Sequence, residues 1–253
     1  MPKQVVIYPY KMGSASAKML AHELGVTRVY PDRNFKPTAN HVVINWGNGN
    51  IPNWNGKGFT FLNRPERVLN AINKLTSFYK FLKYEVSTPV WTEHREWAEK
   101  WIRNGGKAVA RGELEGLDGS GIMLVDKISE LPDVQLYTKY VPISKEWRVY
   151  VFAGQVIDIL EKRRHNIEKA DPFIRTEHNG WVFCKGEFNI PREASENAVK
   201  AISALGLDFG GVDIIYNEEA NKSYVLEVNT APGIGGDTVD KFAEAIRGYV
   251  GSL

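Results

Sequence analysis

Three oxygen-bearing side chains interrupt two apolar runs near the end of the chain. Asp213 lies within one run, and Glu227 and Asn229 stand two apart in the next. Side chains alternate along a strand, so Glu227 and Asn229 would share one face. If the runs pair across the polar turn 217–222, all three side chains converge, and hard oxygen ligands of this kind suit magnesium. A solvated sheet face is the alternative for Asp213 alone, but carboxylates among valines and isoleucines need partners, which favours a metal site.

Basic residues also occupy strand-like positions. Arg148 lies within one such run, and Lys162, Arg163 and Arg164 follow another. By alternation, Lys162 and Arg164 would share a face while Arg163 points away. Cations beside a metal could hold a transferring phosphoryl group and its developing charge. A charge run on an exposed strand end is the competing interpretation of the triplet, and Arg175 is a weaker candidate in a polar stretch.

A glycine-rich loop over 115–121 lies between two strand-like runs and contains Gly116, Gly119 and Gly121. Flexible glycine backbone can bring N–H groups against phosphate oxygens. The loop has neither the Lys-Ser/Thr of a P-loop nor the G-x-G-x-x-G pattern, so the two common nucleotide motifs do not apply. A plain hairpin turn is the alternative, because glycines are frequent in turns.

Composition excludes several other functions. The 253 residues include 43% apolar and 25% charged residues, as in ordinary soluble globular proteins. A formal charge of +2 does not indicate a nucleic-acid partner. No apolar run is long enough to span a bilayer, the lone Cys184 can form no internal disulfide, and the histidines lack zinc spacing. We therefore expect a cytoplasmic protein with no membrane partner.

The elements that must position these residues begin with a β-α unit. Ser14 is a predicted N-cap and Gly25 a predicted end of the first helix, and Ala153-Gly154 predicts a tight hairpin turn. The expected helices are 14–24, 67–84, 93–103, 192–205 and 238–249. The expected strands are 5–8, 28–30, 41–45, 89–91, 108–110, 122–125, 147–152, 155–160, 211–216 and 223–229.

This order predicts a mixed α/β and α+β protein in three parts. Residues 1–72 form a small N-terminal α/β layer, residues 73–140 a central α+β lid, and residues 141–253 a C-terminal α+β sub-domain with the acidic strands.

The whole series resembles the ATP-grasp superfamily. It is most similar to the peptide-ligase branch that includes ribosomal-protein glutamate ligases, and to related carboxylate-amine ligases of bacteriophages. Gly211-Val212-Asp213 and the run from Leu226 to Gly233 match the family's magnesium motif, which is the most specific stretch of the chain. The resemblance implies the ATP-grasp fold, with the small N-terminal layer beside two α+β sub-domains that grip ATP between them.

The resemblance also implies roles for individual residues. Lys74 matches a lysine that touches the nucleotide phosphates, and Arg111 stands where the family has a second lysine, so the charge is kept but the geometry differs. Glu146 fits the acid that holds the ribose, and the segment 136–141 fits the adenine hinge. The implied nucleotide-binding set is Lys74, Arg111, Glu115, Gly119, Ser120, Gly121, Lys139, Tyr140, Val141 and Glu146. The implied catalytic set is Arg148, Lys162, Arg164 and Arg175, and the implied metal ligands are Asp213, Glu227 and Asn229.

The implied activity is ATP-dependent ligation of a carboxylate to an amine. The acid attacks the γ-phosphate of ATP with two magnesium ions at the phosphates, and the amine then displaces phosphate from the acyl-phosphate. The substrates would be small-molecule, amino-acid or peptide acids and amines. Ligation to a thiol, phosphorylation of a small molecule, and a non-catalytic nucleotide-binding module remain alternatives, although Asp213, Glu227 and Asn229 argue against the last.

Overall fold

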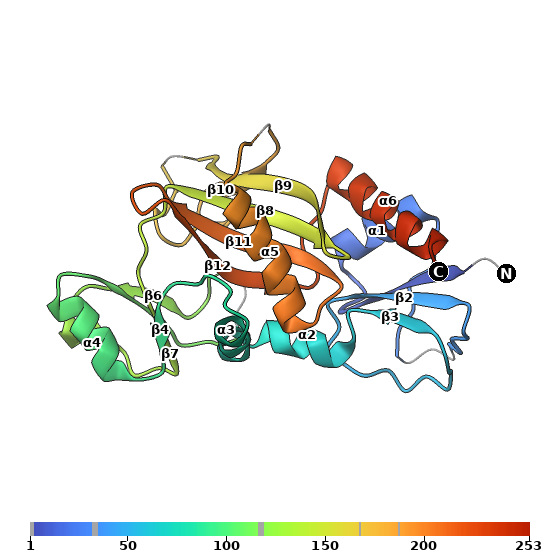
Figure 1. The fold of residues 1–253 in the computed structure, drawn as a ribbon, viewed down its shortest axis with the longest axis horizontal. Helices are drawn as coiled ribbons and strands as arrows, with labels where there is room; N and C mark the ends of the chain where they lie inside the picture. Colours follow the sequence, from blue (N-terminus) through green and yellow to red (C-terminus); the bar gives the residue numbers. More distant parts are fainter. Residues whose placement is uncertain (1–2, 32–34, 116–118, 167, 187) are drawn as a thin grey trace.

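The computed structural model describes residues 3–31, 35–115, 119–166, 168–186 and 188–253, and these residues form three separate β-sheets (Figure 1). The first sheet is parallel, with strand order β1-β2-β3. The second and third are antiparallel, with orders β4-β7-β5-β6 and β10-β9-β8-β11-β12. Within these ranges no helix is long and apolar enough to cross a membrane.

The first sheet contains β1 (Gln4–Pro9), β2 (His41–Trp46) and β3 (Thr60–Leu62), with α1 (Ala15–Leu24) following β1. The predicted caps of α1 are confirmed: the Ser14 hydroxyl accepts the Ala17 N–H at 3.3 Å, and Gly25 is left-handed. The expected strand at 28–30 is wrong. That segment meets β1 only at one isolated bridge between Ile7 and Arg28, which is too short for a ladder. Strand β3 was not predicted.

The single helix expected at 67–84 is also wrong, because the structure has two helices, α2 (Pro65–Ile72) and α3 (Lys74–Lys83). Asn73 between them is extended at ψ 112, and its side-chain oxygen accepts the N–H of Thr76 at 3.0 Å. This asparagine therefore caps α3 and ends the continuous helix, although the apolar periodicity of the sequence continues across the break. The break makes Lys74 the first residue of α3.

The second sheet and its helix form the part that we expected as a central lid. It contains β4 (Trp91–Thr92), α4 (Arg95–Arg103), β5 (Ala108–Arg111), β6 (Ile122–Val125), the 3₁₀ helix η1 (Ile128–Glu130) and β7 (Leu136–Lys139). The glycine-rich loop joins antiparallel β5 and β6, and the Gly112 N–H donates to the Gly121 carbonyl at 2.7 Å. Residues 116–118 of this loop, including Gly116, lie outside the described residues.

The third sheet contains β8 (Lys145–Phe152), β9 (Gln155–Arg164), β10 (Trp181–Cys184), β11 (Phe209–Asn217) and β12 (Lys222–Asn229), with helices α5 (Arg192–Leu205) and α6 (Asp237–Gly251). The hairpin turn between β8 and β9 is confirmed, with φ 47 at Ala153 and φ 79 at Gly154. Strands β11 and β12 pair antiparallel as predicted. Edge strand β10 was not predicted.

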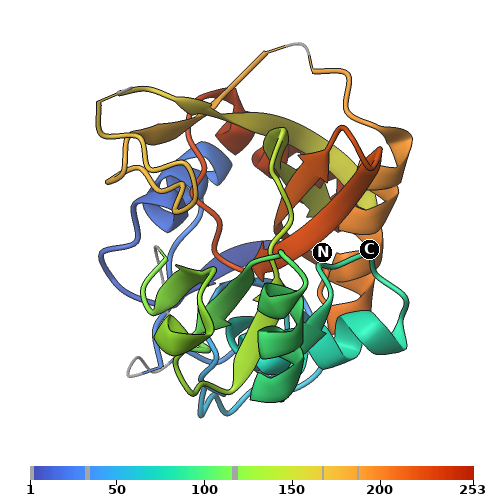
Figure 2. The same cartoon turned by 90° about the vertical axis from the view of Figure 1, so that its left-hand side faces the viewer.

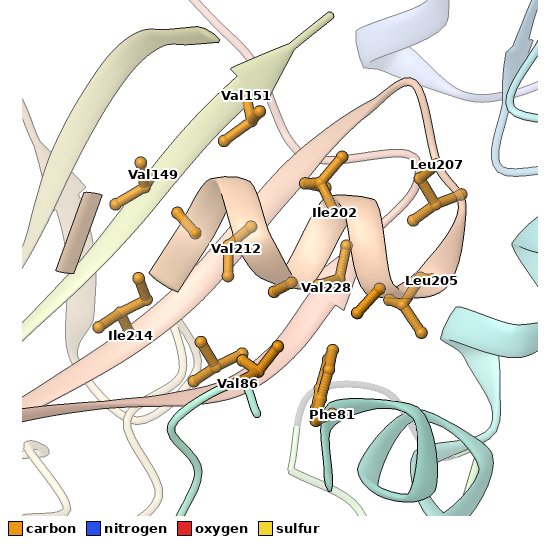
Figure 3. Close-up of a cluster of buried hydrophobic side chains, with 14 of the residues drawn as sticks. Phe81, Val86, Val149, Val151, Ile202, Leu205, Leu207, Val212, Ile214 and Val228 are labelled. Atoms are coloured by element: carbon orange, nitrogen blue, oxygen red, sulfur yellow. The ribbon is translucent and has the colours of Figure 1, made fainter. Parts of the chain in front are cut away.

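One face of the third sheet is sealed by α5 (Figure 3). Valines of β8 and β11 point toward this helix, together with Ile214, Val228 and, from α3, Phe81. The alternate residues of the same strands point to the opposite face, so alternation turns Arg148 and Asp213 away from this core. Figure 2 shows the second sheet lying below the strands of the third.

A second core joins the first layer to the end of the chain. Trp46 of β2 stacks on Phe209 of β11 at 5.5 Å between ring centroids and meets Phe242 of α6 edge-on at 5.4 Å. Each of the three predicted ranges holds one sheet, and we propose on this ground that 1–72, 73–140 and 141–253 are the sub-domains. The first and third nevertheless share this core.

Asn63 connects β3 to the start of β11. It is fully buried at φ 58, and its side-chain oxygen accepts the N–H groups of Asp208 at 2.8 Å and Phe209 at 3.2 Å. Its amide nitrogen donates to the Phe209 carbonyl at 2.9 Å, and its own N–H donates to the Asp208 carboxylate at 2.6 Å. Asparagine satisfies both the left-handed backbone and the buried polar groups here.

Replacing Asn63 with glycine should lower the free energy of unfolding by about 2–4 kcal/mol, because buried groups lose three hydrogen bonds while the backbone keeps its conformation. Asn221→Gly is the matched control, since Asn221 is exposed at φ 46. It should cost about 1 kcal/mol or less. Urea unfolding measures both, and equal losses would contradict the bridging role of the Asn63 side chain.

Candidate active site

A cavity of about 980 Å³ lies among the three sheets and α3. Its walls come from β8, β9, β11 and β12 on one side and from β5 and β7 on the other, with Tyr10, Lys11 and Gly47 contributed by the first layer. The volume is at the upper end for ligand pockets and can hold more than one small molecule.

The predicted convergence of three oxygen-bearing side chains is present in the structure. Asp213 on β11 stands directly opposite Glu227 on β12. The Asn229 amide nitrogen lies 3.3 Å from Asp213 Oδ2 and 3.4 Å from Glu227 Oε1. No group of three or more His, Cys, Asp or Glu side chains with metal-binding geometry occurs in the described part of the chain, so this set of two carboxylates and one amide depends on Asn229. A cation would require the amide oxygen, which a half-turn of the amide group supplies.

Asp213 is held by a two-pronged ion pair with Arg148. The arginine Nε and Nη2 donate to the two carboxylate oxygens at 2.7 and 2.8 Å, and both side chains are largely buried. Burial alone would raise the pKa of Asp213, but the charge and hydrogen bonds of Arg148 lower it. The pKa of Arg148 is raised in turn, because Asp213 outweighs the effect of burial. Both groups are therefore charged at neutral pH.

Glu146 forms a second buried pair, with Lys162 at 2.7 Å, and Arg175 lies 3.7 Å from its other oxygen. Burial raises the pKa of Glu146, and the lysine opposes this effect only in part. Arg175 also donates to the Ile143 carbonyl at 3.2 Å, which fixes its guanidinium at the cavity wall. The sequence analysis assigned Lys162 and Arg175 to the catalytic cations, and in the structure both form ion pairs with the Glu146 carboxylate.

Arg111, at the end of β5, is the cation with an unmet hydrogen-bonding group. Its side chain lines the cavity and the residue is only 7% exposed, yet its Nε has no partner within the described residues. Burial lowers the pKa of Arg111, and Glu227 partly offsets this effect. A buried N–H donor without an acceptor is costly, so an anionic ligand that accepts from the Arg111 Nε would stabilise this side of the cavity.

Lys74 and the hinge residues also line this cavity. Lys74 lies 3.7 Å from Glu227 Oε2, at the start of α3. The N–H groups of Lys139 and Tyr140 donate to the carbonyls of Val90 and Lys107 at 2.7 and 3.0 Å. Among the described residues, the Val141 N–H makes no backbone hydrogen bond. Of the three hinge residues, Val141 is thus the one able to offer an N–H to a base edge.

Three predicted site residues do not reach the cavity. Ser120 and Gly121 lie in the lid hairpin, where the Ser120 hydroxyl donates to the Glu113 carboxylate at 2.6 Å, whereas Glu115 and Gly119 do line the cavity. Arg164 lines an adjoining hollow of about 440 Å³ that shares Lys162 and Arg175 with the main cavity. The expectation that Arg164 faces the same volume as the acidic set is therefore wrong, because Arg164 is the last residue of β9.

Sequence reasoning missed several cavity residues. Trp181 and Phe183 come from the unpredicted strand β10, and their spacing of two in an apolar run was the available signal. Tyr10 and Lys11 directly follow β1, and the carboxyl end of a parallel strand is a common place for a ligand.

The three sheets are arranged as in ATP-grasp ligases of known structure. A solved structure of the ATP-grasp ligase PsnB, complexed with minimal precursor, Mg and ADP, aligns with a TM-score of 0.68 over 97% of this chain and 96% of that chain, at 16% identity. Residues 117–244, half of the chain, match the RimK-like ATP-grasp domain. The chain therefore belongs to the RimK-like ATP-grasp family.

Several curated proteins are similar in sequence, and two of them illustrate the range. A probable alpha-L-glutamate ligase of Haemophilus influenzae is 26% identical over 198 residues, which cover 73% of this chain and 63% of the relative. The ribosomal protein bS6–L-glutamate ligase of Salmonella paratyphi B is 31% identical over 144 residues, covering 52% of this chain and 45% of the relative. The chain thus spans less than two thirds of the length of either relative.

Removing the arginine of the central ion pair should be more damaging than removing both charges. Arg148→Met strands the buried Asp213 carboxylate and should cost about 3–5 kcal/mol of unfolding free energy, and adding Asp213→Asn should recover most of that loss. Urea unfolding of the four proteins completes the cycle. Arg163→Met is the control, because the Arg163 side chain is 55% exposed, and it should cost about 1 kcal/mol or less. A double variant as unstable as Arg148→Met would refute the stranded-charge account.

Proposed function

We propose that this protein is an ATP-dependent ligase that joins a carboxylate to an amine and releases ADP and phosphate. The observation that carries the proposal is one cavity in which two carboxylates and an amide face a set of buried cations, one with an unmet donor. This arrangement suits a polyphosphate with its metal. The family and the ligases named among the relatives and structural neighbours support the same reaction class.

The nucleotide would lie between the second and third sheets. In this proposal the Val141 N–H contacts the adenine edge, Glu146 holds the ribose, and Lys74 and Arg111 contact the phosphates, while Glu115 and Gly119 cover them. The buried guanidinium of Arg111 fits this role. Burial keeps water from its Nε, and a phosphate oxygen can accept the hydrogen bond that water would otherwise accept. Arginine in place of a lysine adds directional donors.

The metal ligands would be Asp213, Glu227 and Asn229, and we propose two magnesium ions. The chemistry of this donor set fits, since carboxylate and amide oxygens are what magnesium prefers. When bound, magnesium neutralises charge on the phosphates as they transfer. Arg148 lies 2.7 Å from the Asp213 carboxylate, and Lys74 lies 3.7 Å from the Glu227 carboxylate. Both cations would therefore be next to the phosphates that the magnesium ions bind.

The proposed reaction has two steps. An oxygen of the acid forms a bond to the γ-phosphorus of ATP, and the bridging bond to ADP breaks, which gives an acyl-phosphate and ADP. The neutral amine then forms a bond to the acyl carbon, and phosphate departs with the acid's oxygen as the amine loses a proton. Arg148 and Lys162 would balance the charge of the transferring group. No protein nucleophile is needed, because alignment and charge neutralisation supply the rate.

Amino-acid or peptide substrates are the proposed class for both the acid and the amine. The names of the relatives, an alpha-L-glutamate ligase and a ribosomal-protein glutamate ligase, and the precursor bound to the structural neighbour support this choice. The cavity is large enough to hold a nucleotide with part of a second substrate.

ADP release with acid and amine mixtures tests the proposal. We expect ADP only when both are present, a hydroxamate when hydroxylamine replaces the amine, and ¹⁸O from labelled acid in the released phosphate. Glu227→Gln, which keeps the shape but replaces a charged carboxylate ligand with a neutral amide, should lower turnover at least about 100-fold with the fold intact. A phosphorylated alcohol or a thioester as the product would contradict amide ligation and support one of the alternative reactions. ADP release without a ligated product would show that the protein only hydrolyses ATP.

The glycine loop should be sensitive to a side chain at Gly119. This residue has φ 78, and an added Cβ would lie 2.7 Å from Cγ2 of Ile174, which also lines the cavity. Gly119→Ala should therefore hold the lid open and raise the KM for ATP roughly 10-fold. Gly105→Ala is the matched control, because Gly105 has the same φ of 78 with nothing within 4 Å. Equal KM values for the two variants would contradict lid closure at this contact.

A further inference from the structure

Strand β10 is a four-residue edge strand with two aromatic side chains on one face. It pairs only with β9 in the described sheet, and its register places Phe183 opposite Lys162 and Trp181 opposite Arg164. Such directly opposed residues have neighbouring side chains on the same face. The Phe183 ring therefore lies beside the cavity cation Lys162, the Trp181 ring lies beside Arg164 of the adjoining hollow, and both rings line the cavity.

Four cations lie over these two rings. Arg148 and Lys162 lie 4.3 and 4.8 Å from the centroid of Phe183. Arg175 and Arg164 lie 4.5 and 5.3 Å from the ring of Trp181. All four distances are within the range in which an aromatic face attracts a cation. Trp181 is itself fixed, because it is 5% exposed and its indole N–H donates to the Asp171 carbonyl at 2.8 Å.

We propose that Phe183 and Trp181 are positioning residues that hold the cavity cations in place for an anionic ligand. Arg148 and Lys162 each have one carboxylate partner, and an arriving phosphate must share or replace it. A second carboxylate at the position of Phe183 would hold the cations equally well but would cancel their charge. An aromatic face attracts them through its quadrupole and leaves their net positive charge available to phosphate.

The inference rests on the proposed function, since it assumes that the anion is a nucleotide phosphate. It goes further by assigning a role to β10, a strand whose four residues carry no charge of their own. It also accounts for Arg148 remaining in place if Asp213 turns toward a metal, because the ring lies on the arginine independently of the carboxylate.

Fluorination of the Phe183 ring tests the proposal with little change of shape. One, two and three fluorines weaken the negative face of the ring in steps, whereas its packing stays nearly constant. The dissociation constant of ADP with magnesium, measured by calorimetry, should rise stepwise to a total of about 10-fold across the series. The KM for ATP should rise in parallel, and the far-UV circular dichroism spectrum should stay unchanged, which shows that the fold is kept.

The control is the same series at Phe188, whose ring carries Arg163 at 5.3 Å outside the cavity. It should leave ADP affinity unchanged. A flat affinity across the Phe183 series would overturn the positioning role, and so would an equal slope at Phe188. ADP binding by the wild-type chain without any ligation would overturn the proposed reaction alone, because the slope at Phe183 still decides this inference. No ADP binding by the wild-type chain would overturn both.

Discussion

The ion pair between Arg148 and Asp213 sets the geometry of the whole site. The two residues stand directly opposite each other on the paired central strands β8 and β11. Their side chains share a face because the alternate residues, Val149 and Val212, are committed to the core beneath α5. That core fixes the register of the strands, since a slip of one residue would move the buried charges into an apolar layer.

Neighbouring charges follow from the same register. Glu146 and Lys162 occupy the same face of β8 and β9, and Glu227 lies across from Asp213 on β12. Each of these acids already has a cationic partner, whereas Arg111 on the facing sheet has a donor without one. The cavity therefore has paired charges on the acidic strands and an unused hydrogen-bond donor on the opposite wall. An anion that binds between the walls resolves this imbalance.

The sequence predicted best where alternation and turn chemistry agree. The pairing of β11 with β12, the Ala153-Gly154 hairpin and the caps of α1 each depend on local residues, and all three are confirmed. It failed at Asn73, where one side chain caps a new helix inside a continuous apolar period. Strand β10 was missed because its only local signal is the spacing of Trp181 and Phe183, and its four residues form a strand by pairing with β9 across a polar segment. The ion pairs of Lys162 and Arg175 with Glu146 also depend on tertiary contacts, which local sequence patterns do not reveal.

The packing of α6 against α1 and β2 has a consequence for how the chain folds during synthesis. Phe242 and Ile246 of α6 complete the core around Trp46, so β2 is covered by a segment that is made much later than β2 itself. Contacts of such large sequence separation form slowly, because a long loop must be closed before they contribute. Until α6 leaves the ribosome, the face of the first sheet around Trp46 stays open to water and to chaperones. Deleting α6 would thus leave the core around Trp46 incomplete.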